Sequence, residues 1–351
     1  MRRREFLSLC LGVMAASFAG KGAVFAAESA DEADPLKGIT IIDAHSHPDE
    51  FFTVRSGGDS SSSMSSIKQL GMSATAFCAV GDSKQPGGFW EESFPGLMAQ
   101  LGRAMRYVES GKTKLILKTS DVASHVAPGE PTGCILGIEG ANPLQEGLDR
   151  FDEVHRMGVR IITLGHYMAS AFTDVMGEPP RHGGLSLLGR SAIERMDRLG
   201  IIIDAAHASS DSLAQMAEIT KRPIIDSHTS PSPGYGRATG RFRGSREMEI
   251  IAKTNGIVCT WPMAYRRGDY RRESFLDWAQ EILEMKKRIG MEHVGLGTDG
   301  GGHLPARIKG YSDVRDLRKL AQAMTEVGLT REDIAAYMGG NFLRVFKAYT
   351  G

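Results

Sequence analysis

Eight short apolar segments recur along the chain, and amphipathic stretches with helical spacing separate most of them. Continuous apolar runs are typical of parallel strands buried on both faces, and repeated strand and helix units favour a parallel barrel. A doubly wound open sheet is expected to carry a glycine-rich phosphate turn after an early strand, and this sequence has none. We therefore predict an α/β fold with a single (β/α)8 TIM-type barrel. The predicted strands span residues 39–43, 74–80, 134–138, 161–164, 201–204, 224–226, 257–260 and 294–297, and the clearest helices span 148–157, 191–199, 212–220, 247–254 and 275–289.

The N-terminal residues differ from the rest of the chain. Arg3 and Arg4 precede Phe6 and Leu7, a modest apolar stretch follows, and small residues end the segment. This order is typical of a twin-arginine signal peptide, predicted here for residues 1–27. An uncleaved membrane anchor is the alternative, but the apolar run is shorter than the ~20 residues that a spanning helix needs. We expect export by the twin-arginine route to the periplasm or the extracellular space, with no membrane span after cleavage.

The remainder of the chain shows no second shift in composition. Residues 28–37 are predicted to be a flexible lead-in and residues 38–351 the barrel, with a Ser- and Gly-rich loop at 56–66. Lys plus Arg and Asp plus Glu both number 42, so the charge balance does not point to nucleic acid as a partner. Three cysteines lie in apolar runs and are expected to be buried structural thiols, namely Cys78, Cys134 and Cys259.

The first predicted strand runs into two histidines, His45 and His47. Residues two apart on a strand project from the same face, so both imidazoles can reach one metal ion. Taken alone, the pair is equally compatible with two hydrogen-bonded polar residues at a strand end.

Five further predicted strands also run into an ionisable residue. The carboxyl ends of parallel barrel strands meet on one face, where barrel enzymes place their chemistry. Burying many ionisable groups together carries a large desolvation penalty unless an opposite charge compensates for it. Neutral imidazoles combined with carboxylates suit zinc, so the pattern predicts a divalent metal site. The five residues are Glu139, His166, His207, His228 and Asp299.

These motifs resemble those of the renal (membrane) dipeptidases, which are binuclear zinc enzymes of the amidohydrolase superfamily. The resemblance covers nearly the whole mature chain, and it implies a barrel of the metal-dependent hydrolase kind with two bound Zn²⁺ ions. The segments that carry it are residues 43–47 (DAHSH), 137–140 (GIEG), 163–166 (TLGH), 204–209 (DAAHAS), 223–230 (PIIDSHTS), 297–300 (GTDG) and 339–346 (GGNFLRVF).

The resemblance implies a ligand role for most of the residues at the strand ends. His45 and His47 would bind the first metal ion. His207 and His228 would bind the second ion, and Glu139 would bridge both.

It also implies catalytic and substrate-binding roles. Asp299 would lie beside the first metal ion and transfer a proton to the leaving amine, while His166 would stabilise the oxyanion. An arginine after the last histidine ligand would bind the terminal carboxylate of the substrate. Arg243 fits that position best, followed by Arg241 and then Arg237.

The sequence departs from the family at His47, where membrane dipeptidases usually have aspartate. The change removes one negative charge from the first metal's ligands and leaves the substrate range open. We predict a zinc dipeptidase whose partner is a dipeptide, with a D-residue at its carboxyl end left open. The alternatives are a hydrolase of N-acyl amino acids, other amides or lactones, and a non-catalytic metal-binding barrel. Related enzymes are often dimers, so a homodimer also stays open.

The remaining histidines and a cluster of arginines are predicted to be surface or loop residues. They are His125, His155, His182 and His303, together with Arg266, Arg267, Arg271 and Arg272.

Overall fold

The computed structural model describes residues 34–48, 62–85, 88–238, 240–302 and 304–351. The predicted signal peptide at 1–27, most of the lead-in, residues 56–61 of the Ser-rich loop, and His303 lie outside these ranges. Residues Pro35–Gly351 group into one unit, which is described below.

Eight parallel strands form a nearly closed barrel at the centre of this unit. Neighbouring strands pair in the order β1-β2-β6-β7-β8-β9-β11-β14. The ends of the series meet through an isolated parallel bridge between Ser46 and Gly300. Asp43 supports this closure, because its carboxylate accepts the Thr298 N–H at 2.7 Å and the Thr298 hydroxyl at 2.5 Å. The barrel strands are β1 Ile42–Ser46, β2 Ala74–Val80, β6 Gly133–Glu139, β7 Val159–Thr163, β8 Ile202–Asp204, β9 Ile225–Pro231, β11 Ile257–Thr260 and β14 Val294–Leu296.

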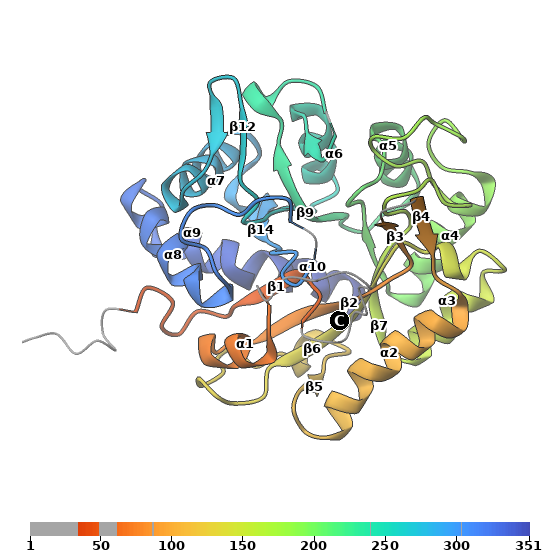
Figure 1. Ribbon diagram of the computed structural model, residues 1–351, viewed down its shortest axis with the longest axis horizontal. Helices are drawn as coiled ribbons and strands as arrows, with labels where there is room; N and C mark the ends of the chain where they lie inside the picture. The colour runs from red at the N-terminus through yellow and green to blue at the C-terminus, as the bar shows by residue number, and fades with distance from the viewer. Residues whose placement is uncertain (1–33, 49–61, 86–87, 239, 303) are drawn as a thin grey trace, which may run out of the picture. The chain divides into compact units, whose positions relative to one another are not determined.

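Most of the helices lie around the outside of the barrel and connect its strands (Figure 1). The α-helices of the described residues are α1 Met64–Leu70, α2 Phe94–Glu109, α3 Asp149–Arg156, α4 Leu187–Leu199, α5 Ser210–Ile219, α6 Ser245–Lys253, α7 Phe275–Ile289, α8 Leu317–Glu326, α9 Arg331–Ala335 and α10 Asn341–Thr350. Shorter strands lie in the connections, namely β3 Asp82–Gln85, β4 Gly88–Glu91, β5 Lys114–Leu115, β10 Phe242–Arg243, β12 Tyr265–Arg267 and β13 Tyr270–Arg272.

The apolar core has two layers, one inside the barrel and one between the barrel and its helices. Alternation along each strand separates the two layers. In β6, Ile135 belongs to the inner cluster, while Leu136 and Ile138 belong to the cluster that contains the helices. Helix α10 adds Phe342 and Phe346 to the inner cluster, so it packs against residues from the barrel interior.

The predicted barrel is confirmed, and each predicted strand overlaps one of the eight barrel strands. The largest differences are at β1, which begins three residues later than predicted, and at β9, which continues to Pro231. The extension of β9 could not be predicted from hydrophobicity, because residues 227–231 are mostly polar although they are buried. The three described cysteines are free and buried, as predicted.

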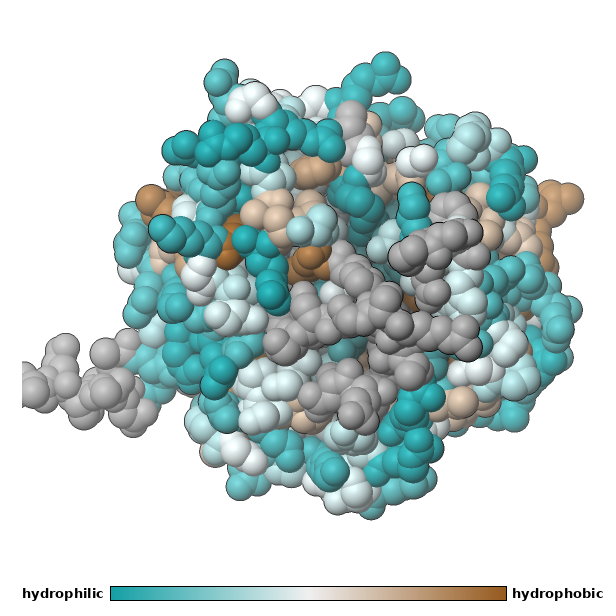
Figure 2. All heavy atoms as spheres, viewed as in Figure 1, coloured by the Kyte–Doolittle hydropathy of each residue, from teal (hydrophilic) through white to brown (hydrophobic). Residues whose placement is uncertain are grey.

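The face presented in Figure 2 is mostly hydrophilic. Figure 2 shows hydrophobic residues as small separate areas among hydrophilic ones on the face that it presents. None of the described helices has the length and hydropathy that crossing a membrane requires.

Candidate metal centre and its cavity

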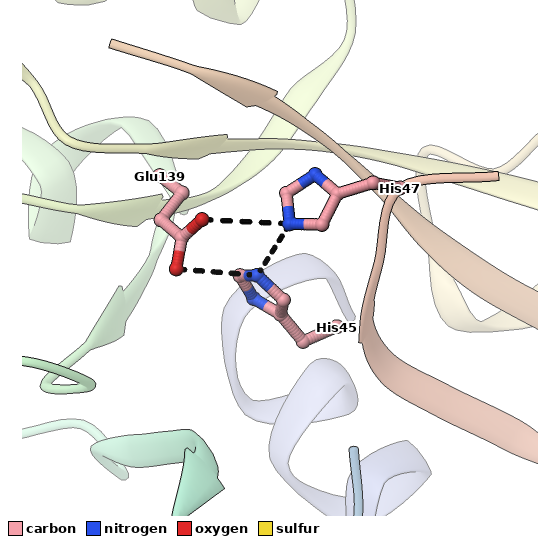
Figure 3. Close-up of side chains that lie close together, drawn as sticks. All are labelled: His45, His47 and Glu139. Atoms are coloured by element: carbon pink, nitrogen blue, oxygen red, sulfur yellow. Dashed lines mark hydrogen bonds and ion pairs between the residues drawn. The ribbon is translucent and has the colours of Figure 1, made fainter. Parts of the chain in front are cut away.

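Four histidine side chains converge on the carboxylate of Glu139. The Nε2 atoms of His207 and His228 lie 2.9 and 3.2 Å from Oε1 of Glu139. The Nε2 atom of His45 lies 3.4 Å from the same oxygen, and that of His47 lies 3.4 Å from Oε2 (Figure 3). All five side chains are almost completely buried. The residues predicted as ligands from the ends of separate strands therefore form one cluster.

The cluster contains two groups of side chains that could each hold a metal ion, and both groups include Glu139. The Nε2 atoms of His45 and His47 are 3.2 Å apart, and those of His207 and His228 are 3.1 Å apart. Nitrogen ligands at about 2.0–2.1 Å from a tetrahedral zinc ion lie about 3.3 Å from each other. Each histidine pair forms, with Glu139, a group of buried ligand atoms close enough to hold one ion. These residues therefore fit a pair of divalent ions bridged by Glu139.

The hydrogen bond at Nδ1 of His47 orients the ring so that Nε2 points at Glu139. Its Nδ1 atom lies 2.8 Å from the backbone carbonyl oxygen of Cys78. A carbonyl oxygen can only accept, so Nδ1 carries a proton, and Nε2 is the atom through which this ring would bind a metal ion. This support from a neighbouring strand is typical of metal-binding histidines.

The charges of the cluster favour a bound cation. Burial raises the pKa of Glu139, but the positive charge of His166 and His45 outweighs burial and holds that pKa well below its usual range. Burial lowers the pKa of His207 and His228, which favours the neutral form that binds metal. Burial also opposes charge on His47, yet hydrogen bonds to Asp299 and Glu139 raise its pKa to about 10. A divalent ion can replace the proton held between His47 and these carboxylates.

Two residues of the site adopt left-handed backbone conformations. His207 has φ 66° and Asp299 has φ 49°, values that are uncommon for residues other than glycine. The backbone around them is fixed by hydrogen bonds, including Met176 N–H to the His207 carbonyl at 2.7 Å and Asp299 N–H to the His45 carbonyl at 2.9 Å. Such strain at the ends of strands is typical of functional sites.

Asp299 and His166, the two residues predicted to be catalytic, also lie beside the cluster. Oδ1 of Asp299 lies 3.5 Å from Nε2 of His47, and Nε2 of His166 lies 3.5 Å from Oε2 of Glu139. Burial raises the pKa of Asp299, but the hydrogen bond from His47 outweighs it and leaves that pKa below its usual value. Asp299 is therefore an ionised carboxylate beside the first pair of ligands.

Asp82 is a buried residue of the site that the sequence analysis missed. Its Oδ1 atom lies 2.7 Å from Nδ1 of His166. The same carboxylate accepts the backbone N–H groups of Tyr167 at 3.2 Å and Met168 at 3.1 Å. Asp82 follows β2 by two residues, so extending the search for ionisable residues slightly past each strand end would have found it.

The candidate ligands open into a cavity of about 310 Å³. A volume at the lower end of the range for ligand pockets suits a small molecule. The apolar part of the cavity wall, formed by Trp261 and Met263 just after β11, was not predicted from the sequence. The lining residues are His47, Ser83, Glu139, His166, Tyr167, His207, His228, Arg241, Trp261, Met263, Asp299, Gly302 and Pro305.

A family model described as membrane dipeptidase (peptidase family M19) matches residues 58–350. The chain belongs to this family. The matched residues include Glu139, His207, His228 and Asp299, whereas His45 and His47 precede them and are assigned to the metal centre by their geometry.

Two of the relatives that the chain resembles in sequence are named as dipeptidases. The chain is 26% identical over 274 residues to dipeptidase tcpJ of Claviceps purpurea, covering 77% of this chain and 64% of that protein. It is 32% identical over 217 residues to dipeptidase aclJ of Aspergillus oryzae, covering 60% and 50%. The chain thus spans between half and two thirds of the length of these relatives.

Solved structures share the fold of this chain. The probable dipeptidase PvdM of Pseudomonas aeruginosa aligns with a TM-score of 0.75 at 19% identity, over 90% of this chain and 96% of that one. A metallo peptidase of Rhodobacter sphaeroides, liganded with a phosphinate mimic of the dipeptide L-Ala-D-Ala, aligns with a TM-score of 0.74 at 19% identity, over 89% and 99%.

The structure reverses the predicted order of the arginines. Arg241 lines the cavity, and its Nη1 atom is buried without a hydrogen-bond partner among the described residues. Its Nη2 atom donates to the backbone carbonyl of His228 at 3.2 Å, and its guanidinium lies 5.4 Å from the ring centre of Trp261. Arg237 is exposed and does not line the cavity.

Arg243, the residue predicted first for carboxylate binding, is buried and fully engaged elsewhere. Its Nε atom donates to Asp226 at 2.5 Å. Its Nη1 and Nη2 atoms donate to the backbone carbonyls of Ala208 at 2.8 Å and Ala205 at 2.5 Å. Arg243 therefore braces the backbone on both sides of His207 and is not available to a substrate in the cavity.

One arginine of the predicted basic patch is also not a surface residue. Arg266, Arg267 and Arg271 are exposed as predicted, but Arg272 is completely buried. Its Nη1 atom lies 2.6 Å from Glu281 in α7, which neutralises it inside the protein.

Proposed function

We propose that this chain is a zinc-dependent dipeptidase with a binuclear metal centre. The observation that carries the proposal is the pair of histidine couples that share Glu139, set in a small cavity that also contains an unpaired guanidinium nitrogen of Arg241. A metal centre beside a group that recognises carboxylates is the arrangement expected for hydrolysis of a short peptide.

The two metal ions are assigned to separate histidine couples. His45 and His47 would hold the first ion and His207 and His228 the second, with Glu139 as the shared ligand. When bound, such a pair of zinc ions supplies a water molecule of lowered pKa and a positive charge that polarises the amide carbonyl.

Two side chains would carry out the proton transfer and charge stabilisation. Asp299 is ionised and lines the cavity, so it can accept a proton from the attacking water and return it to the departing amine nitrogen. His166 presents Nε2 on the cavity side, while Asp82 holds its Nδ1 atom. A proton on Nε2 of His166 can therefore be donated to the carbonyl oxygen as negative charge develops there.

Arg241 is proposed to bind the terminal carboxylate. Its planar guanidinium can pair with a carboxylate through two parallel hydrogen bonds, and the cavity leaves room for a short chain only. The Rhodobacter sphaeroides relative was crystallised with a mimic of a dipeptide that ends in D-Ala. We therefore include a D-residue at the carboxyl end among the proposed substrates.

A second candidate activity is the hydrolysis of N-acyl amino acids. Arg241 would bind their carboxylate equally well, and the apolar side chains of Trp261 and Met263 in the cavity wall suit an acyl group. We also propose that the protein is exported by the twin-arginine route, on the strength of Arg3 and Arg4 before the N-terminal apolar stretch.

The decisive experiment compares substrates that differ at one end. Purified protein is loaded with zinc, and hydrolysis of L,L-dipeptides, L,D-dipeptides, N-acetylated analogues and carboxyl-amidated analogues is measured, with a chelator-treated sample as control. We expect chelator-sensitive cleavage of the free dipeptides and little cleavage of amidated ones. Faster cleavage of the N-acetylated analogues would select the second activity, and no cleavage of any member by the loaded protein would contradict both.

A further inference from the structure

One buried hydroxyl group links the two proposed metal sites. Oγ of Ser227 lies 2.9 Å from Nδ1 of His228 and 3.1 Å from Nδ1 of His45. The two rings lie side by side, with centroids 3.9 Å apart. His45 belongs to the first group of ligands and His228 to the second, so Ser227 contacts both groups without being a ligand itself.

An irregularity in β9 explains why Ser227 and the adjacent His228 can both reach the metal centre. Val258 of β11 pairs with Asp226, whereas Thr260 pairs with Thr229. Strand β9 therefore has one residue more than β11 over this stretch, which is the pattern of a β-bulge. Consecutive residues of a regular strand point to opposite faces, and the bulge removes that restriction here.

The hydroxyl matches what both rings require when their Nε2 atoms bind metal. Coordination through Nε2 uses the lone pair of that atom, so the proton of each neutral ring is on Nδ1. A serine oxygen has two lone pairs and can accept both N–H groups at once.

Neither ring has a strong alternative partner at Nδ1. His47 is fixed by a backbone carbonyl, but the other described group close to Nδ1 of His45 is the thiol of Cys78, at 3.6 Å. A thiol is a weak acceptor. For His228, the hydrogen-bond partner of Nδ1 among the described residues is Ser227.

We infer that Ser227 is a positioning residue shared by both metal sites, which holds His45 and His228 in the protonation form and orientation that bind metal. The inference rests on the proposed binuclear centre. It predicts that loss of this one hydroxyl weakens the binding of both metal ions, although Ser227 is not a ligand of either.

The test is a stepwise zinc titration against a chromophoric competing chelator, using the full chain with Ser227→Ala. Loss of a hydrogen-bond partner of a metal ligand typically weakens binding by about 10–100-fold, so both stepwise dissociation constants are expected to rise by about that factor. The matched control is Ser212→Ala. Ser212 is equally buried, and its hydroxyl bonds to Ser209 at 2.8 Å and Asp174 at 3.0 Å, neither of which is a candidate ligand.

Two outcomes overturn the inference. Unchanged affinity for both ions would show that the hydroxyl is dispensable, and a change in one constant alone would show that it serves a single site. Ser227→Cys, which keeps a weak acceptor at the same position, is expected to fall between the wild type and Ser227→Ala, and it tests the inference if the alanine variant does not fold. A wild-type chain that binds fewer than two zinc ions would instead overturn the binuclear centre itself.

Discussion

Nδ1 of His166 lies 2.7 Å from Oδ1 of the buried carboxylate of Asp82. Asp82 begins strand β3 and His166 follows β7, so the contact joins two connections at the same end of the barrel. A carboxylate on Nδ1 fixes the ring and keeps a proton there, which leaves Nε2 facing the cavity. Burial opposes charge on His166, but Glu139 and Asp82 outweigh it and raise its pKa.

Replacing Asp82 should impair the chemical step more than substrate binding. Asp82→Asn keeps the size of the side chain but removes its charge, so a positive charge on His166 loses the carboxylate that stabilises it, and the ring loses part of its ability to stabilise an oxyanion. We expect kcat to fall about 100-fold with little change in KM. A double-mutant cycle with His166→Ala is the check. If the two losses simply add, Asp82 does not act through His166.

Arg241 should determine the requirement for a free carboxylate. Hydrogen bonds to charged groups contribute about 1.5–3 kcal/mol, so Arg241→Ala should lower kcat/KM for free dipeptides about 10–150-fold. Carboxyl-amidated dipeptides do not present the charge, and their slow hydrolysis should be nearly unaffected. Steady-state kinetics on both substrates decides the matter, and equal losses on the two would assign Arg241 to some other role.

Arg243 should affect folding instead. Its guanidinium is buried against Asp226 and two backbone carbonyls, so Arg243→Ala leaves a buried carboxylate without its partner. Breaking a buried pair in this way typically costs about 3–5 kcal/mol of folding free energy. Urea unfolding of Arg243→Ala and Arg241→Ala measures the difference, and we expect the second variant to lose much less stability. Comparable losses would contradict the distinction drawn between these two residues.

The sequence was sufficient to predict the barrel and to single out the residues that cluster at its end, because both depend on local patterns. A parallel strand buried on both faces is apolar throughout, and a polar residue at its end is conspicuous, as His207 and Glu139 illustrate. The roles of Arg241 and Arg243 are different in kind. They are two residues apart, but Arg243 lies on β10, which pairs with β9, the strand that carries Asp226, and no local pattern indicates this contact. The burial of Arg272 likewise depends on Glu281, which no local pattern connects to it.

Asp174 should make the protein sensitive to acid. Burial raises its pKa, but the backbone N–H groups of Gly184, Arg181 and His182 outweigh burial and lower that pKa below its ordinary value. A carboxylate with a depressed folded pKa stabilises the protein above its unfolded pKa of about 4, and this contribution is lost as the pH falls through the folded value.

Urea unfolding of the wild type and Asp174→Asn between pH 7 and pH 3 tests this expectation. At pH 7 the variant should be less stable by about 1–3 kcal/mol, because one or more N–H groups lose a charged acceptor. The difference should begin to shrink as the pH falls below about 4, where the carboxylate of the unfolded chain becomes neutral, and should be lost as the pH falls through the lower folded value. A difference that stays constant with pH would show that the charge of Asp174 does not stabilise the loop.

Removal of metal should lower the stability of the whole barrel, because the proposed ligands come from different strands. Without a cation, the burial of Glu139 and the four imidazoles is compensated only by contacts with one another and with neighbours such as Asp299 and His166. Free zinc at a hundredfold excess over its dissociation constant stabilises the folded state by about 2.7 kcal/mol for each site. We therefore expect dialysis against a chelator to lower the Tm and addition of zinc to restore it.

Two variants make this thermal measurement specific, one at the shared ligand Glu139 and one at His155, which belongs to neither group of ligands. Glu139→Gln should largely abolish the response to zinc, since the bridging carboxylate belongs to both groups of ligands. His155→Ala should keep the full response, because His155 lies on α3, outside the cavity and the ligand groups. A Tm that rises with zinc equally in the wild type and in Glu139→Gln would place the ion elsewhere in the protein.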